Sequence, residues 1–523
     1  MSNNTENWLS SDFSCKQVYV RTIFLAWLAV VILVTMGNPA FADDPTALEL
    51  NSPLWVADIE SSDTGTSLTL SENAYAILAE LDSVRLTDFP LSKDETVDLK
   101  LEQFSITTPT TLIVAGTDQG DVPIAPPDIV LFRGTIADVN DSRVVLGISP
   151  RGCHGILWSG QKGYVITPNR WTREASVDLR HVIHELSELP EPDPAEVSGC
   201  GGTLTPTEEP EPADLPPANI EAAQFRSLRV ALECDYEFWD RFNDLHDALE
   251  YVYILFGAGN DIFQRDVSVK ITLTFIRIWT TINDPYSYTG GGNEALTEFE
   301  NYWRANHNPG QPGFIERDLA HLLSSRGING WGEQGSALCS YDRGYSCSGG
   351  NHTGPTLPES LLHDVGIVFH ELGHNSNAQH TFDFNPPIDC CVVQGNCTAQ
   401  DCNDAPSTIM SYCHNCPGGR NNILHQFHAL NIARMRTEID ASCLWISRHP
   451  CYVDYRNSGT EDGTSANPYN TVKEGVEAVL PNGTVSIANG NYQEANWLNL
   501  VTKITIWQPM TLTATGGTVT IGQ

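Results

Sequence analysis

Three histidines and one glutamate have the spacing of ligands and base in a hydrolytic metal site. His370 is followed directly by Glu371, and His374 lies four positions after His370. His380 comes six positions later. Residues four apart lie on one face of a helix, so two imidazoles can reach a single ion with the glutamate beside it. Three nitrogen ligands and one open position are the coordination that a hydrolytic zinc ion requires.

The first two histidines need a helix, and the third needs a turn that returns it to them. Thr356 and Glu359 fit a capping-box pattern, so the helix is expected to begin there. After the second histidine, Asn375 and Asn377 weaken the helix, because asparagine tolerates the left-handed backbone of a sharp turn. Such a turn would swing the third histidine back as a ligand. The apolar stripe expected to bury this helix consists of Leu361, Val365, Val368 and Leu372.

Residues 370–380 read H-E-x-x-H-x-x-N-x-x-H, which resembles the zinc-binding motif of the metzincins. Residues 407–412, with Met410, resemble the Met-turn of that family, and the chain has only five methionines. Upstream, residues 318–323 and 335–339 resemble two core strands of reprolysin/adamalysin-like enzymes. The chain is thus similar to bacterial reprolysin-like zinc metalloproteases. The resemblance implies an α/β catalytic domain built from a mixed twisted sheet and an active-site helix.

Two positions depart from the family pattern. Asn377 stands where the family usually has glycine, and both residues reach positive φ, so the turn is still expected. Thr381 stands where adamalysins usually have aspartate directly after the third histidine. These differences favour the bacterial reprolysin-like relatives over the adamalysins proper.

The resemblance also implies roles for the residues around the metal. Glu371 is expected to act as general base, taking a proton from a zinc-activated water and passing it to the leaving amine. Met410 would form an apolar floor beneath the zinc without ligating it. Tyr412 has two interpretations: it stabilises the oxyanion or ligates the metal displaceably, or it is a core tyrosine behind the Met-turn. The expected cofactor is Zn²⁺, with structural Ca²⁺ as a further possibility for which the sequence offers no firm ligands.

Residues 335–339 resemble the edge strand along which metzincin substrates lie extended. Backbone pairing at such an edge holds a peptide whatever its sequence. The expected partner is therefore a protein or peptide substrate, and the expected activity is that of an endopeptidase.

Residues 184–219 are dominated by Glu, Pro, Asp and Thr and are expected to form a linker. Cys200 lies within it between Gly199 and Gly201. Its thiolate could occupy the open zinc position, as a short Cys-Gly resemblance to latency cysteines of metzincin propeptides implies, and the chain would then be a zymogen. The alternative is a disulfide between Cys200 and Cys153 or another cysteine.

The N-terminus resembles a secretory signal peptide over residues 1–42. Lys16 and Arg21 precede an apolar run that is short for a membrane span, and Ala40 and Ala42 fit a small-x-small cleavage site. No later stretch is apolar enough to cross a bilayer, so no stable span is expected after cleavage. We expect a secreted, extracellular protein, with the periplasm or cell surface as alternatives.

The remaining chain predicts a multidomain protein. Residues 43–183 are expected to form a β-rich prodomain, and residues 225–447 begin with a strand, a helix and a strand, which predicts the mixed α/β catalytic domain. Short β runs over residues 448–523 resemble the opening coils of a parallel β-helix, with a small β-sandwich-like appendage as the alternative. The prodomain strands are expected at residues 129–136, 143–148, 155–158 and 163–167.

Charge and cysteine content bound the partners and the compartment. The formal net charge is −36, so binding to nucleic acid or to anionic membranes by charge is not expected. Most of the 14 cysteines cluster between Cys339 and Cys451, which predicts disulfides in an oxidising compartment. Cys413 and Cys416 form a C-x-x-C that could indicate redox chemistry or a second zinc, but clamping disulfides of unknown pairing are favoured.

A second class of function stays open at this stage. The chain could be an adhesion protein that keeps a protease-like fold and contacts polysaccharide or a surface through residues 448–523. The intact Glu371 disfavours this, because a binding protein needs no base. A β-helix polysaccharide lyase is excluded because the C-terminal β region is too short to form a cleft.

Overall fold

The structure is a computed structural model. It describes residues 48–57, 65–160, 162–168, 179–189, 225–349, 358–448, 450–479, 483–493, 504, 506 and 510–522. The signal-like segment 1–42, Thr356 and the linker cysteine Cys200 lie outside the described residues. Among the described helices, none is both long and apolar enough to traverse a bilayer.

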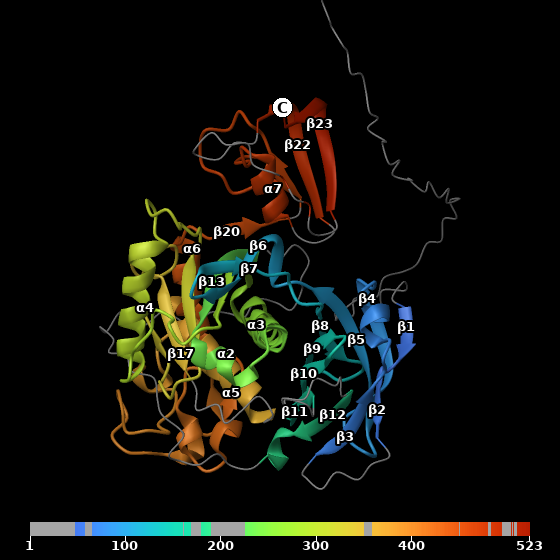
Figure 1. Ribbon diagram of the computed structural model, residues 1–523, viewed down its shortest axis with the longest axis vertical. Coiled ribbons are helices and arrows are strands. Elements are labelled where there is room, and N and C mark those ends of the chain that lie inside the picture. Colours follow the sequence, from blue (N-terminus) through green and yellow to red (C-terminus); the bar gives the residue numbers. More distant parts are fainter. Residues whose placement is uncertain are drawn as a thin grey trace, which may run out of the picture. The chain divides into compact units, whose positions relative to one another are not determined.

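The N-terminal region forms a ten-stranded sheet in the order β1-β4-β5-β8-β9-β10-β11-β12-β3-β2 (Figure 1). All of its pairings are antiparallel except that of β1 with β4. The four strands predicted from sequence fall in β8 to β11 and are confirmed. The elements are β1 Leu48–Asn51, β2 Leu54–Val56, β3 Thr66–Leu70, α1 Ala74–Leu78, β4 Ser83–Pro90, β5 Thr96–Phe104, β8 Val130–Ile136, β9 Ser142–Ser149, β10 Gly152–Ser159, β11 Lys162–Pro168 and β12 Arg180–Glu185.

A second, mixed sheet has the order β16-β17-β15-β13-β14-β6-β7, with β20 also paired to β13. Its central strands are parallel, and β16 at one end is antiparallel to β17. Strands β6 and β7 come from the stretch 43–183, so this stretch contributes to both sheets. The strands are β6 Thr107–Thr117, β7 Gly120–Pro123, β13 Phe225–Cys234, β14 Val269–Trp279, β15 Leu319–Ser324, β16 Trp331–Gly332, β17 Tyr345–Gly349 and β20 Trp445–Ser447.

One predicted strand is wrong. Residues 335–339 form bends and turns, and the antiparallel edge strand is β16. The cause is local backbone geometry: Gly335, Ser336 and Cys339 have φ of 64°, 54° and 63°, which a strand cannot contain. The other predicted core strand, at 318–323, corresponds to β15 and is confirmed.

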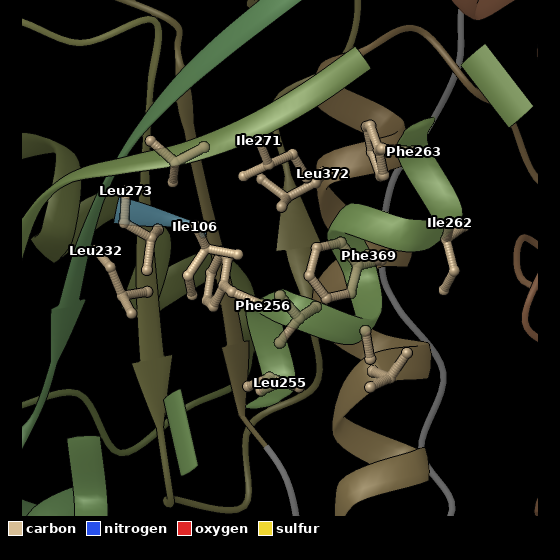
Figure 2. Close-up of a cluster of buried hydrophobic side chains, with 14 of the residues drawn as sticks. Ile106, Leu232, Leu255, Phe256, Ile262, Phe263, Ile271, Leu273, Phe369 and Leu372 are labelled. Atoms are coloured by element: carbon tan, nitrogen blue, oxygen red, sulfur yellow. The ribbon is translucent and has the colours of Figure 1, made fainter. Parts of the chain in front are cut away.

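Helices α3 and α5 pack against the mixed sheet. Asp244 caps α3 by accepting the amides of His246 and Asp247, and the left-handed Ser268 ends it. Figure 2 shows Phe369 of α5 beside Phe256 and Phe263 of α3. The helices and short paired strands are α2 Tyr236–Phe242, α3 Leu245–Val267, α4 Gly292–Asn306, α5 Pro358–Asn375, α6 Ala429–Ala441, β18 Ser407–Thr408 and β19 Ile423–Leu424.

The C-terminal region contains β21 Cys451–Val453, β22 Gly483–Tyr492 and β23 Met510–Ile521, which pair in parallel. Parallel stacking is the pairing direction of β-helix coils. Helix α7, Val472–Ala478, begins with a capping box between Thr471 and Glu474. Residues 510–521 form one strand, and its register with β22 shifts between Ala488 and Gly490.

Disulfides clamp the loops after α5, as the cysteine cluster predicted. Cys413 and Cys416 do not pair with each other, which excludes the redox interpretation of their C-x-x-C. The described bonds are Cys339–Cys443, Cys390–Cys397, Cys391–Cys413 and Cys402–Cys416. Cys153 is buried and forms no disulfide.

Gly259 fixes the approach of α3 to α5, because a Cβ atom there would lie 1.7 Å from the Phe369 ring. We therefore expect Gly259→Ala to lower the free energy of unfolding by about 2 kcal/mol, as overpacking does. Urea unfolding monitored by circular dichroism measures this. The control is Gly366→Ala on α5, where the nearest atom would be His425 Nε2 at 3.9 Å. That change should be neutral or slightly stabilising, since alanine favours a helix; equal unfolding midpoints for both variants would contradict the close approach.

Candidate metal centre

His370, His374 and His380 meet in the interior of the protein. One ring nitrogen of each lies within 4.8 Å of those of the other two, and all three residues are buried. His370 and His374 project from the last two turns of α5, and His380 follows the turn that ends the helix. The sequence spacing thus corresponds to a real cluster of imidazoles.

The opposite nitrogen of each ring is held by the protein. Nδ1 of His370 lies 2.8 Å from the carbonyl oxygen of Ile409, and Nδ1 of His374 lies 2.9 Å from that of Ala378. Nδ1 of His380 lies 3.2 Å from Asp383 Oδ2. A carbonyl or carboxylate oxygen can only accept, so each Nδ1 carries the proton. In the neutral form of each ring, Nε2 is then the nitrogen that carries the free lone pair.

The donor set fits a tetrahedral zinc ion. Nε2 of His374 and Nε2 of His380 lie 3.2 Å apart. When both nitrogens are unprotonated, their lone pairs repel each other unless a cation lies between them. Nε2 of His370 is buried and has no hydrogen-bond partner. Two nitrogens each about 2.1 Å from a tetrahedral zinc are about 3.4 Å apart, which matches this spacing.

Burial favours the neutral form of two of the ligands, His370 and His374. It lowers the pKa of His370 to about 3, with a smaller contribution from His380. Burial followed by the neighbouring imidazoles places the pKa of His374 well below its usual value. A metal ion therefore need not displace protons from these two rings near neutral pH.

The backbone turn after α5 follows the predicted geometry. Asn377 has φ of 74°, the left-handed conformation expected at this position. Its amide donates to the carbonyl of His374 at 2.8 Å, and the amide of Ala378 donates to Gly373 at 2.9 Å. This turn also places the Ala378 carbonyl where it orients the second histidine.

Met410 lies beneath the histidines and is fully buried. A Cβ atom on Gly373 would lie 3.0 Å from its sulfur, so α5 rests directly on it. The preceding residue, Ile409, supplies the carbonyl that orients His370. Met410 itself accepts the amide of Thr381 at 3.2 Å and so helps to position the segment that carries His380.

Glu371 is buried against the edge strand β16. A Cβ atom on Gly330 would lie 2.0 Å from Glu371 Oε1, and one on Gly332 would lie 3.2 Å from Oε2. Only glycine allows the strand to approach this carboxylate so closely. The sequence interpretation missed these glycines; their alternation around Trp331, upstream of the histidine motif, was the available signal.

Tyr412 brings its hydroxyl to the cluster. The oxygen lies 3.2 Å from His380 Nε2, and the ring stacks on His370 with centroids 6.1 Å apart. Phe382 packs on the other side at 5.0 Å. A hydroxyl in this position can donate to an anionic oxygen at the site or contact the ion.

Asp383 was not identified from the sequence. It lies in the short 3-10 turn Thr381–Asp383, two positions after the Thr381 that replaces the aspartate of adamalysins. Its carboxylate holds His380, so the chain supplies an acidic partner from a shifted position. The sequence does show an acidic residue three positions after the third ligand. Whether its side chain points toward His380 depends on the 3-10 turn, which the sequence alone did not predict.

Other candidate ligands have structural roles. His425 packs on Trp158 with ring centroids 5.8 Å apart, and His428 caps α6 by accepting the amide of Leu430. Burial lowers the pKa of His363 to about 3. Among the described residues, two further acidic and cysteine groups each contain both sulfurs of a disulfide, which cannot act as thiolate ligands.

One family model matches the region of the chain that contains the three histidines. Residues 225–423 match the reprolysin model described as Metallo-peptidase family M12. A solved structure of metalloproteinase-II from Bacteroides fragilis is 13% identical, covers 59% of this chain and 85% of its own, and gives a TM-score of 0.34. No curated protein sequence matches the chain.

Asp383→Ala should weaken zinc binding about 10- to 100-fold, because the loss of a carboxylate that orients a ligand has effects of this size. Competition with a chromophoric chelator measures the dissociation constant directly. The control is Asp342→Ala, which removes an exposed carboxylate away from the histidines. If both variants bind zinc as tightly as the unchanged protein, Asp383 does not orient His380.

Proposed function

We propose that the protein is a secreted zinc-dependent endopeptidase made as a zymogen, and the match of residues 225–423 to the reprolysin model of metallo-peptidase family M12 supports this. The observation that carries the proposal is the convergence of one ring nitrogen from each of three buried histidines, on a helix that also carries the buried Glu371. A binding protein that only retained the fold would not need the buried His370 Nε2, which has no hydrogen-bond partner. Nor would it need the Glu371 carboxylate next to the ligands.

His370, His374 and His380 would hold a zinc ion, which would serve as a Lewis acid for the scissile carbonyl and would lower the pKa of a bound water molecule. Glu371 accepts the proton of that water on a carboxylate oxygen and transfers it to the leaving amine. The hydroxyl of Tyr412 donates to the oxyanion as the carbonyl carbon becomes tetrahedral. The ring packing of Tyr412 against Phe382 holds the hydroxyl in place before substrate binds.

The edge strand β16 is the proposed site of substrate binding. It pairs with β17 on one side, and among the described residues no strand pairs with its other side. An extended peptide added to this side would make backbone hydrogen bonds that do not depend on its sequence. Since Gly330 and Gly332 contact Glu371, such a peptide would pass beside the proposed base.

The precursor state and the compartment rest on sequence. The N-terminal signal-like segment and the disulfide-clamped loops support export to an oxidising compartment. Cys200 is the proposed latency thiol, with its thiolate on the open metal position in the uncut chain. Cys153, its suggested disulfide partner in the alternative interpretation, is buried and unpaired in the structure.

Glu371→Ala should lower kcat for casein or peptide cleavage about 100- to 10,000-fold, because the reaction loses its general base. Zinc content measured by atomic absorption should stay at the level of the unchanged protein. The control is Glu72→Ala, which changes an exposed carboxylate on the N-terminal region. Cleavage that survives both Glu371→Ala and chelator treatment would refute a metallopeptidase mechanism.

Cys200→Ala should release peptidase activity in the uncut precursor, because no thiolate would exclude water from the metal. Activity on a quenched peptide is compared with that of the unchanged precursor, with chain integrity checked on a gel. Cys153→Ala removes a buried thiol of the N-terminal sheet and serves as the control. Equal latency of the Cys200→Ala and unchanged precursors contradicts the role of Cys200.

A further inference from the structure

The mixed sheet ends, opposite β16, on strands from the N-terminal region. β6 pairs in parallel with residues 275–279 of β14. The amide of Leu273 donates to the carbonyl of Ile106 at 2.7 Å, and the amide of Thr280 donates to that of Gly116 at 2.9 Å. We call residues 225–447 the catalytic region. Figure 2 shows Ile106 beside Leu273 in the core of this region. The sheet that supports the metal centre therefore includes a strand encoded before the linker.

The buried Arg277 side chain ties the same hairpin to the catalytic region through a carboxylate, Asp121, whose side chain is 37% exposed. Arg277 of β14 donates to Glu233 at 3.0 Å, and to both carboxylate oxygens of Asp121 in β7 at 3.0 and 2.7 Å. The side chain of Arg277 is only 3% exposed, and that of Glu233 is fully buried. A guanidinium in this setting needs its partners, because an uncompensated buried charge is costly.

Helix α3 uses a second face for the N-terminal sheet. Buried residues run without a break from Ala248 to Asn260, so the helix is covered on all sides. The face turned to the N-terminal region carries Tyr253, Gly257, Asp261 and Gln264, which follow helical spacing. The hydroxyl of Tyr253 lies 3.3 Å from that of Thr107, and a Cβ atom on Gly257 would lie 3.4 Å from the Leu131 side chain. Arg143 donates to the Asp261 carboxylate at 3.4 Å, and Arg133 donates to the Gln264 side-chain oxygen at 2.6 Å.

A single hydrophobic core joins the two regions. Its residues from the catalytic region include Leu255, Leu273 and Phe369. Removing the N-terminal region would expose this apolar surface to water and leave the edge of β14 unpaired. The N-terminal members of the core are Ile106, Ile113, Leu131, Val145, Ile156 and Val165.

We infer that residues 48–189 are a permanent, strand-donating partner of the catalytic region and stay bound to it after the chain is cut within residues 190–224. The interaction surface consists of the β14 edge, the Arg277 guanidinium and the second face of α3. This goes beyond the proposed peptidase function, since it concerns which parts stay together whether or not the protein cleaves peptides. It also separates the latency proposed for the linker from the structural role of the β-rich region, which completes the fold.

The test uses the full chain with a recognition sequence for a site-specific protease inserted between residues 205 and 212. A Glu371→Ala background prevents self-cleavage, so the result does not depend on the proposed activity. After the cut, both fragments should co-elute from a size-exclusion column in native buffer at micromolar concentration and separate only in denaturant. Fragments that separate in native buffer, whether soluble or precipitated, overturn the inference.

Variants at the interface identify what holds the fragments. Asp121→Ala removes the second carboxylate from Arg277, and Gly116→Leu would drive a side chain into the Trp279 ring, which lies 2.5 Å from a Cβ at this position. Each should speed dissociation of the cut protein about tenfold or more. Asp98→Ala is the matched control, because Asp98 pairs with Arg85 at 2.8 Å inside the N-terminal sheet. Equal dissociation rates for all three variants would exclude this surface as the attachment.

Hydrogen exchange of the cut protein gives an independent measurement at the strand pair. The amide hydrogens of Leu273 and Thr280 donate only across the two regions, so they report the pairing itself. They should remain as protected after the cut as before it. A loss of their protection in co-eluting fragments would show that the strand is not retained.

Discussion

Three imidazoles can share one ion only if each ring turns an unprotonated nitrogen inward, and here Nε2 is left for this role because the protein engages each Nδ1. The helix α5 brings the first two rings together but does not fix their rotation. Rotation is set by acceptors from three other segments: the carbonyls of Ile409 and Ala378 and the carboxylate of Asp383. The segment that contains Ile409, the turn at Asn377 and the 3-10 turn at 381–383 thus act together. They orient the three rings so that their Nε2 atoms face a common point.

Close backbone approaches allow these segments to converge. Gly259 admits the Phe369 ring between α3 and α5, and Gly373 lets α5 rest on Met410. Gly330 brings the edge strand against Glu371 in the same manner. At each contact a side chain would lie where an atom already is, so glycine is required by packing and not by turn geometry. The precision of the centre therefore depends on interior spacing as well as on the ligands.

Local signals predicted the features that depend on nearby residues. The histidine spacing placed two ligands on α5, and asparagine at position 377 adopts the positive φ expected of it. Prediction from the sequence failed at features whose conformation depends on segments far away in the chain. Ser336 and Cys339 leave the strand region within a segment that Cys339 ties to Cys443, a bond of sequence separation 104. Asp383 points at His380 only because of a turn that propensity does not specify. The β6 strand also escaped prediction, since its partner lies more than a hundred positions away, as the bond from Thr111 to Leu273 illustrates.

The two ends of the mixed sheet differ: a hairpin covers the edge of β14, whereas β16 pairs on one side only among the described residues. An unpaired edge invites association with any extended chain, and proteins usually cover it. At β14 the hairpin of β6 and β7 covers the edge, and Pro123 ends the outer strand, where a missing amide hydrogen discourages further pairing. At the other end β16 is left open but is only two residues long, Trp331–Gly332, and lies against Glu371. A short open edge limits nonspecific pairing while still offering backbone groups beside the proposed base. Strands from the N-terminal region thus close one end of the sheet, and the proposed peptide site lies at the opposite end, at β16.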